Sequence, residues 1–448
     1  MRNTVCCHNE FKVFGRQNMK VLIISHNPIS NQSNMGKTFL SLFSQFDKEE
    51  LCQLYIYPVI PNEDRCASYY RVTDKDALNS LIRLKKPGGE VPVEQISENQ
   101  GLYEETGDQA FYKNRRNKSA LRRLLRDAMW KVAPWYNSSL KAWLDREKPE
   151  CIFVAPGVAK FLYDFALRIS KKLHIPIVTY ICDEYYFVKT PKLGLDALRL
   201  KLLQRKMESL MEATSHLVTI SAELKAEYAE KFGVETTVLM TGATVSPAKA
   251  PKTVSRPENI CYFGNIRCNR FVPLAQIGRA LDQINQAQGK RYRLKIYTAE
   301  RDTQILNTFA DTQSVELCGF VSGAEFDKAL QEADLLLHTE AFDEASIDFT
   351  RHSISTKIAD SLASGIPLFA FGPDGISSML HLQRNRCAIT VTDPRKLRDA
   401  LERALSDEKT REQAAQMGLA VAAQYHDSEM TGLLLRDILA HMIEVGKR

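Results

Sequence analysis

Residues 353–365 combine the side-chain types that bind an anion at the start of a helix. Three hydroxyl residues, all favourable N-cap types, come just before a lysine in the first predicted turn: Ser353, Ser355, Thr356 and Lys357. The first amides of a helix have no partner within it, so together with hydroxyls and a lysine they can bind a phosphate. We therefore predict an anion site at residues 355–357.

Asp360 lies one helical turn after this predicted anion site. From there its carboxylate could accept hydrogen bonds from the hydroxyls of a ribose whose phosphate occupied the helix start. An ordinary capped helix, packed through Ile358 and Leu362, would show the same spacing. Spacing alone does not separate the two interpretations.

A predicted strand that ends in glycine is a second candidate for anion binding, within the segment ICYFGNIRCNRF at 260–271. Gly264 permits a close approach to the backbone at the strand end. Arg267 and Arg270 follow it and could neutralise a diphosphate through paired hydrogen bonds. A tight turn with two solvated arginines is an equally good explanation of this segment.

The loop after the first predicted strand contains Gly36-Lys37-Thr38, which invites comparison with a nucleotide-binding P-loop. That motif needs a glycine five positions before Gly36, so that the backbone can curl around phosphates, but Asn31 stands there. The sequence also has no convincing strand that ends in a magnesium-binding carboxylate. A P-loop NTPase is therefore disfavoured. Gly36 either opens a helix or lets this loop approach a ligand across a cleft.

Short β-branched or aromatic segments alternate with segments of helical period from residue 20 onward, which predicts sheets covered by helices. We predict strands at 20–25, 54–59, 151–156, 175–182, 216–221 and 236–240, and then at 260–264, 292–298, 315–320, 334–339, 366–372 and 387–392. Residues 241–259, between the two sets, are small, polar and proline-rich, as in a domain linker. Each half should form a doubly wound α/β sheet that binds ligands at the carboxyl ends of its strands.

A chain of 448 residues is too long for one ordinary hydrophobic core, so we predict two main domains. The predicted parts are an N-terminal tail at 1–18, a Rossmann-like domain at 19–245, a linker at 246–258, a second Rossmann-like domain at 259–425, and a C-terminal helix at 426–448. That last helix could pack back on the first domain.

The composition is typical of a soluble globular protein, with 44% hydrophobic and 25% charged residues. The N-terminus lacks the apolar core of a signal peptide, and no apolar run approaches the roughly 18 residues of a membrane span. Ten cysteines are scattered without a CxxC pair, which favours free thiols in a reducing compartment over disulfides or zinc. We therefore predict a cytoplasmic protein without a metal site.

Positive charge is concentrated at residues 112–131, which hold eight basic residues and one acid, whereas the net charge of the chain is +6. An apolar stripe of helical period runs through the same segment: Leu121, Leu124, Leu125, Ala128 and Val132. Such a helix could lie on an anionic membrane. A packed helix with a solvated basic face is the main alternative. Nucleic acid is disfavoured as a partner, because no recognised binding motif accompanies the charge.

Three segments resemble, in order, the C-terminal domain of retaining GT-B glycosyltransferases of the glycogen-synthase-like superfamily: GNIRCNRF (264–271), CGFVSGAEFDKALQEADLLLH (318–338) and SISTKIADSLASGIPLFAFGP (353–373). HLVTISAELKAEYAEKFG (216–233) resembles the same enzymes just before their interdomain linker. The most similar subgroup builds bacterial surface polysaccharides. The resemblance implies the GT-B fold, in which two Rossmann-like doubly wound domains face a cleft.

The resemblance also implies roles for individual residues. In such enzymes two glutamates eight residues apart frame the donor. The second holds the ribose and is matched by Asp360, whereas the first would fall at His352. The basic residue that those enzymes aim at the diphosphate is matched by Arg270, and the arginine often found directly after the strand-end glycine is replaced by Asn265.

The implied activity is transfer of a sugar, with retention, from a nucleoside-diphosphate sugar to a glycan or lipid-linked acceptor. Arg270 and Lys357 would stabilise the departing diphosphate without a metal or other cofactor. The remaining candidates are donor-binding or lie on the acceptor side of the cleft: Gly264, Arg267, Ser355, Thr356 and Asp360 for the donor, and His26, Gly36 and Asp183 for the acceptor.

Two other functions stay open on the same frame. A nucleotide-sugar epimerase or hydrolase would need no acceptor. A non-catalytic GT-B subunit that binds a partner glycosyltransferase is a different class, and the absence of a glutamate at His352 keeps this minor alternative open.

Overall fold

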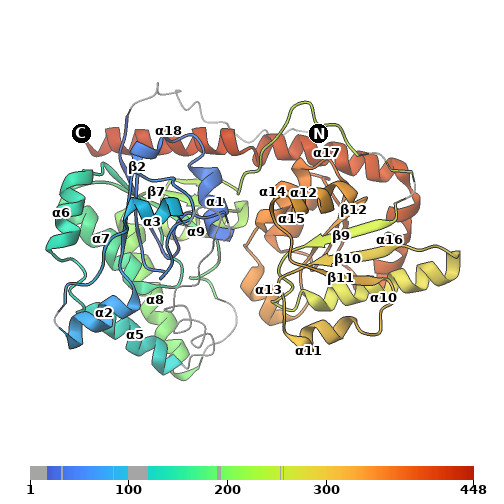
Figure 1. The fold of residues 1–448 in the computed structure, drawn as a ribbon, viewed down its shortest axis with the longest axis horizontal. Coiled ribbons are helices and arrows are strands. Elements are labelled where there is room, and N and C mark those ends of the chain that lie inside the picture. The colour runs from blue at the N-terminus through green and yellow to red at the C-terminus, as the bar shows by residue number, and fades with distance from the viewer. Residues whose placement is uncertain are drawn as a thin grey trace.

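The computed structural model describes residues 18–31, 34–83, 85–98, 120–188, 193–252, 254–255 and 257–447. Within these residues the chain forms two domains that lie side by side, each built on one sheet (Figure 1). Residues 1–17 of the predicted tail at 1–18, and residues 112–119 of the basic segment, lie outside the described residues.

The N-terminal domain is built on an eight-stranded sheet in the order β4-β3-β2-β1-β5-β6-β7-β8. Neighbouring strands are parallel except for β3 and β4. The strands are β1 (Val21–Ser25), β2 (Leu51–Tyr55), β3 (Ser68–Arg71), β4 (Gly89–Glu90), β5 (Cys151–Ala155), β6 (Ile177–Ile181), β7 (Thr214–Thr219) and β8 (Thr236–Val238). Because helices cover both faces, the central strands are buried throughout and consist largely of apolar residues.

The helices described in this domain follow the strands in alternation. They are α1 (Asn34–Leu42), α2 (Asp74–Ile82), α3 (Val93–Glu98), α5 (Ala120–Val132), α6 (Ser138–Glu147), α7 (Lys160–Leu173), α8 (Gly194–Ala213) and α9 (Ala222–Phe232). Local chemistry sets some of their ends. Ser221 caps the start of α9 through the amide of Leu224, and Gly233 ends the helix in the left-handed conformation that its sequence position predicts.

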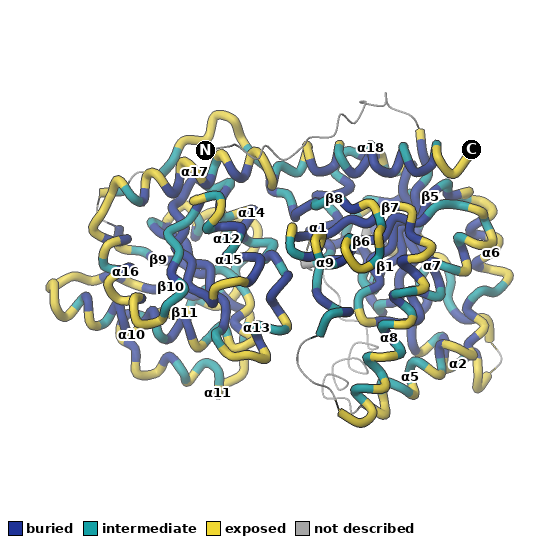
Figure 2. The backbone as a smooth tube through the Cα atoms, turned by 180° about the vertical axis from the view of Figure 1, so that it is seen from behind, coloured by how far each residue is buried: buried dark blue, intermediate teal, exposed yellow. Residues whose placement is uncertain are grey.

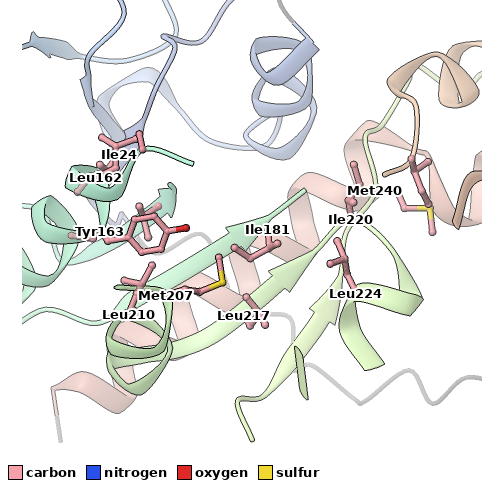
Figure 3. Packing of buried hydrophobic residues seen from close by; sticks show 14 of the residues in the cluster. Ile24, Leu162, Tyr163, Ile181, Met207, Leu210, Leu217, Ile220, Leu224 and Met240 are labelled. Carbon is pink, nitrogen blue, oxygen red and sulfur yellow. The ribbon is translucent and has the colours of Figure 1, made fainter. Parts of the chain in front are cut away.

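The core of the N-terminal domain lies between the sheet and these helices. Figure 3 shows apolar residues from α7, α8 and α9 packed against β6 and β7: Leu162, Tyr163, Met207, Leu210 and Leu224 on the helices, and Ile181 and Leu217 on the strands. On the other face, Phe39 of α1 and Phe43, directly after α1, pack edge-on against Phe153 of β5, with ring centroids 6.1 and 5.1 Å from that of Phe153. The core thus fixes α1 beside the carboxyl ends of β1 and β5.

The C-terminal domain has a six-stranded parallel sheet in the order β11-β10-β9-β12-β13-β14. Its strands are β9 (Asn259–Phe263), β10 (Arg293–Tyr297), β11 (Val315–Gly319), β12 (Leu335–Thr339), β13 (Leu368–Phe371) and β14 (Ile389–Val391). Its helices are α10 (Phe271–Gln288), α11 (Thr303–Leu306), α12 (Gly323–Glu332), α13 (Glu344–Thr350), α14 (Thr356–Ala363), α15 (Ser377–Arg384), α16 (Leu397–Ser406) and α17 (Glu408–Tyr425). The strand order changes direction between β9 and β12: β10 and β11 follow β9 on one side, and β13 and β14 follow β12 on the other. Doubly wound sheets bind ligands at such a point.

The chain crosses between the domains twice, through the linker after β8 and again after α17. The last helix, α18 (Ser428–Gly446), runs along the N-terminal domain (red in Figure 1). Arg436 of α18 makes two 2.7 Å hydrogen bonds to the buried Glu50 carboxylate. Gly432 lies so close to the turn after α1 that a Cβ atom there would be 2.4 Å from Ser44 Oγ.

Every strand predicted from the sequence is present, with ends that differ by at most about four residues. The sequence does not predict β3 and β4, which are short strands at the sheet edge. Seen from behind, the sheets are buried and exposed stretches lie on the outer helices (Figure 2). None of the helices in the described residues has both the length and the apolar character needed to cross a bilayer.

Helix α5 differs from the predicted packed helix with a solvated basic face. Most of its apolar stripe faces outward, and Leu121, Leu125 and Val132 are 53%, 60% and 65% exposed. Two of its arginines are paired instead: Arg126 binds the buried Asp74 carboxylate at 2.9 Å, and Arg123 binds Asp196 at 2.9 Å. The helix is thus packed against α2, α7 and α8, but Arg126 and Trp130 rather than the apolar stripe occupy its inner side.

Candidate functional site

A small pocket opens at the carboxyl edge of the C-terminal sheet, between the ends of β9 and β12 and the start of α14. The residues that line it are Tyr262, Phe263, Asn265, Arg270, Leu337, His338, Thr339, Ser355, Lys357, Ile358 and Ser361. It therefore brings together the two segments that the sequence marks as anion-binding, which are almost a hundred residues apart.

Gly264 makes this meeting possible. Its φ is 139°, a conformation that favours glycine, and a Cβ atom there would lie 2.2 Å from Lys357 Cε and 2.6 Å from Nζ. The lysine side chain therefore lies directly against the backbone at the end of β9. Any side chain at this strand end would collide with Lys357, so the packing of the lysine requires glycine here in addition to the backbone conformation of the turn.

The loop from Gly264 to α10 aims Arg270 into the pocket. Cys268 and Asn269 both have positive φ, 55° and 56°, which is uncommon for residues with a side chain. Arg270 is partly buried and donates two 2.9 Å hydrogen bonds, from Nε and Nη2, to the Glu340 carboxylate just after β12. The arginine predicted to face a diphosphate is thus held in place by a buried glutamate, which the sequence does not single out.

His338 is a further pocket residue that the sequence does not predict. It sits near the end of β12, is 7% exposed, and its Nε2 has no hydrogen-bond partner. Burial lowers its pKa to about 3, and the charges of Arg270 and Lys357 act in the same direction. A neutral imidazole therefore faces the pocket. It can donate a hydrogen bond to a ligand or accept one from it, but it adds no charge.

The start of α14 presents unused polar groups to this pocket. Ser355 is the N-cap residue, but its hydroxyl caps no helix amide and instead lines the pocket beside Lys357. Thr356 is the first residue of the helix. Burial lowers the pKa of Lys357 to about 8, helped by Arg270 and Lys37. A bound anion would relieve this effect, because it favours the charged lysine.

Of the five predicted donor-binding residues only Ser355 lines the pocket, and Gly264 and Thr356 are its direct neighbours, whereas Arg267 and Asp360 lie further away. Arg267 is half-exposed and donates hydrogen bonds of 2.6 and 3.0 Å to Glu300, so its guanidinium is turned away. The prediction that Arg267 contacts a diphosphate is not supported by this geometry. Asp360 lies on α14 outside the pocket and is exposed on one side. The protein on its other side partly removes water from the carboxylate, and this desolvation raises the pKa of Asp360.

The N-terminal domain approaches this site through α1. Helices α1 and α14 contact one another, and the exposed Lys37 is close enough for its charge to lower the pKa of both Lys357 and Asp360. Its neighbour Gly36 is buried in the first turns of α1. Of the two roles that the sequence left open for Gly36, this position in the first turn of α1 fits the opening of a helix, and an approach to a ligand across the cleft stays a prediction.

The two other acceptor-side candidates lie at different strand ends of the N-terminal sheet. His26 follows β1, and its Nδ1 is 2.7 Å from Asn27 Oδ1. Asp183 follows β6 and accepts hydrogen bonds from Tyr185 and, across the domain boundary, from Ser353. Asp183 thus links the N-terminal domain to the segment that leads into α14.

His352, where the resemblance expects a glutamate, does not line the pocket. Its ring points to the N-terminal domain, with Nε2 3.2 Å from Glu227 Oε2 and 3.7 Å from Glu184 Oε2. These three residues form a cluster in which a metal ion could bind, outside the donor pocket. The pocket itself is lined by two cations, of which Arg270 is paired with Glu340, by several hydroxyl groups and by a neutral imidazole, a set suited to an anion with neighbouring hydroxyl groups.

The comparisons with known proteins agree with this geometry. Residues 257–407 match the family model described as "Glycosyl transferases group 1". No curated protein matches the sequence with significance.

Solved structures match along almost the whole chain. Sucrose-phosphate synthase from Thermosynechococcus elongatus is 10% identical, with a TM-score of 0.59 over 95% of this chain and 100% of that one. The Anabaena protein HepE in complex with UDP is 12% identical, with a TM-score of 0.60 over 94% and 100% of the two chains. The UDP-forming trehalose-phosphate synthase from Burkholderia xenovorans is 12% identical, with a TM-score of 0.57 over 95% and 100%.

The fold is therefore GT-B, with two parallel-sheet domains, and the C-terminal domain is a group 1 glycosyltransferase domain. Together these matches support a glycosyltransferase of the GT-B type.

Proposed function

We propose that the protein transfers a sugar from a nucleoside-diphosphate sugar to a glycan or lipid-linked acceptor, with retention at the anomeric carbon. The observation that carries the proposal is the convergence of Gly264, Arg270, Ser355 and Lys357 on one pocket of the group 1 glycosyltransferase domain. HepE was solved with UDP and with UDP-glucose, which makes a uridine diphosphate sugar the first donor to test.

In this proposal the protein stabilises the leaving group. The departing diphosphate is bound by Lys357, the first amides of α14 and the Ser355 hydroxyl. Arg270, held in place by the buried Glu340, adds positive charge. Asp360 binds the ribose from the next turn of α14. The step needs no cofactor and no metal at the diphosphate, because two cations already face it.

The acceptor would lie on the N-terminal side of the cleft, near Gly36, His26 and Asp183. A lipid-linked acceptor would require the protein to work at a membrane surface as a cytoplasmic peripheral protein. The outward-facing apolar residues of α5 support this location, since they are flanked by basic residues that anionic lipid attracts. The same chemistry fits a role in surface polysaccharide biosynthesis.

A donor panel tests the proposed function. The full chain is incubated with UDP-glucose and other nucleotide sugars, each with and without glycan and lipid-linked acceptors, while free nucleotide, epimerised sugar and glycosylated acceptor are all measured. We expect acceptor-dependent nucleotide release, with retained configuration in the product. Release without an acceptor indicates a hydrolase, and epimerised sugar indicates an epimerase. Absence of turnover with every donor would favour a non-catalytic subunit and overturn the proposal.

A further inference from the structure

The segment between α13 and α14 joins the two domains at a point outside the donor pocket. Arg351 and His352, at the end of α13, reach the N-terminal domain, where they meet Glu184 in the loop after β6 and Glu227 on α9. Both C-terminal residues are buried. The side chains that meet here therefore come from both domains.

The spacing of three of these side chains suits a metal ion. His352 Nε2 lies 3.2 Å from Glu227 Oε2 and 3.7 Å from Glu184 Oε2, and the three ligand atoms all lie within 4.8 Å of one another. Zinc bound tetrahedrally at about 2.0–2.2 Å separates its ligands by about 3.3–3.5 Å. Small side-chain movements would bring the three atoms to such separations.

No hydrogen bond explains the burial of His352, although its Nε2 lies 3.2 Å from Glu227 Oε2. It is 5% exposed, and neither of its ring nitrogens makes a hydrogen bond. Buried polar groups are normally hydrogen-bonded, because the loss of water otherwise destabilises the fold. A metal ion on Nε2 would satisfy the nitrogen that faces the two carboxylates.

Glu184 is already positioned to use one oxygen as a ligand. Its Oε1 accepts hydrogen bonds from the amides of Tyr186 and Phe187, at 2.6 and 2.7 Å. Its side chain is 1% exposed, so the carboxylate cannot turn to solvent. Oε2 is left facing His352 and Glu227. Supporting hydrogen bonds of this kind orient the ligands of metal sites.

Arg351 contacts the carboxylates of Glu184 and Glu227, but only through long hydrogen bonds. Its Nη2 donates a 2.7 Å hydrogen bond to the Phe187 carbonyl oxygen, but it is 3.4 Å from Glu184 Oε2 and 3.5 Å from Glu227 Oε2. Strong charge-assisted bonds are about 2.7–2.9 Å long. One guanidinium also leaves one of the two negative charges unbalanced, which favours an additional cation.

We propose that Glu184, Glu227 and His352 bind a divalent ion of the Zn²⁺ class that links the two domains. Two ligands belong to the N-terminal domain and the third precedes α14 by a few residues. A bound ion would therefore hold the start of α14, where Ser355 and Lys357 lie, at a fixed distance from the N-terminal sheet. This site is distinct from the donor pocket and takes no part in leaving-group chemistry.

The test is binding of Zn²⁺ to the chelator-stripped full chain, followed by calorimetry, with Co²⁺ absorption as a second readout of ligand geometry. We expect one ion per chain, a tetrahedral Co²⁺ spectrum, and a rise in Tm on addition of Zn²⁺. Glu227→Gln and His352→Ala should each weaken Zn²⁺ binding at least about tenfold, since even supporting residues of a metal site contribute that much.

Glu223→Gln is the matched control. Glu223 lies one turn earlier on α9 and pairs with Arg384 across the same domain boundary, but it offers no ligand to the cluster. This variant should bind Zn²⁺ as tightly as the wild type. Equal affinity in the wild type and the Glu227→Gln/His352→Ala double variant would overturn the proposal, as would a wild type that binds no Zn²⁺. Neither result would alter the expected donor binding, which is measured separately with UDP.

Discussion

Gly264 and Lys357 form the tightest contact in the candidate donor site. Gly264→Ala places a methyl group where the lysine side chain lies, so Lys357 must move away from the pocket. Loss of a charge-assisted hydrogen bond costs roughly 1.5–3 kcal/mol. UDP binding measured by calorimetry should therefore weaken by about tenfold to a hundredfold.

Gly289→Ala is the control for this substitution. Gly289 ends α10 with a φ of 63°, so alanine is strained there too, but its Cβ would meet nothing within 4 Å. This variant should lose some thermal stability and keep its affinity for UDP. If both variants bind UDP like the wild type, the contact between Gly264 and Lys357 does not shape the donor site.

The sequence predicts some residues of this site and not others for a physical reason. Gly264, Ser355 and Lys357 are visible because a strand end and a helix start each have a local chemistry. Glu340 and His338 gain their roles only because β12 lies beside β9, which local spacing does not reveal. Arg267 looks equivalent to Arg270 in the sequence. Its pairing with Glu300, after a different strand, is what removes it from the pocket.

Helix α5 presents an apolar surface whose role is testable at a membrane. Leu121 and Leu125 are exposed and take no part in the two ion pairs that Arg126 and Arg123 make with Asp74 and Asp196. Changing both leucines to serine should therefore leave these ion pairs intact. Each buried CH₂ contributes about 0.8 kcal/mol, so the Leu121→Ser/Leu125→Ser variant should lose most of its sedimentation with anionic vesicles.

Met430→Ser controls for apolar exposure elsewhere, because Met430 is also exposed but lies on α18. It should sediment with vesicles like the wild type. Unchanged sedimentation of the double leucine variant would reject the membrane role of α5. Charge reversal of Arg123 or Arg126 would be a poor test, since both arginines already hold α5 to its neighbours.

At the level of elements, strand positions follow from the sequence better than helix orientation does. Buried parallel strands such as β5 and β6 are continuous apolar runs and are easily predicted. The apolar stripe of α5 predicts an inward face, but Arg126 and Trp130 take the inner side because both reach the same buried carboxylate, Asp74. That preference depends on α2, which lies far away in the sequence.

The second crossing between the domains contains a pair of buried histidines. His381 Nε2 and His426 Nε2 are 2.9 Å apart, and His426 Nδ1 is 3.0 Å from the Thr241 carbonyl oxygen in the linker region. With both rings neutral, His426 donates from Nδ1 to this carbonyl oxygen and accepts at Nε2 from His381 Nε2–H, so both contacts are satisfied without charge. Burial lowers the pKa of His381 to about 3 and that of His426 to about 4.

This pair predicts how acid affects the stability of the whole molecule. Both histidines have a lower pKa in the folded protein than the ordinary value of about 6.5, so the unfolded chain takes up protons first as the pH falls. Their contribution is full above pH ~6.5 and declines toward pH 4 by up to about 1.4 kcal/mol per histidine and pH unit. Thermal melts of the full chain should show this loss.

His381→Gln keeps a donor for His426 but removes one titrating group. Its melting temperature should therefore fall less steeply between pH 6.5 and pH 4 than that of the wild type. His441→Gln, on α18 and away from the pair, should keep the wild-type slope. An identical slope for His381→Gln would show that the pair does not govern the acid response.

The central claim is that the pocket at the start of α14 binds the diphosphate of a nucleotide sugar through Lys357. The most direct measurement is calorimetric titration of the full chain with UDP at pH 7 and pH 9. Because the pKa of Lys357 is lowered to about 8, the wild type should bind one UDP and lose about tenfold in affinity as the lysine loses its proton. Lys357→Met should bind more weakly at pH 7 and lose this dependence, whereas Lys295→Met on β10 should match the wild type. Wild-type affinity that is equal at both pH values, or undiminished in Lys357→Met, would contradict the account.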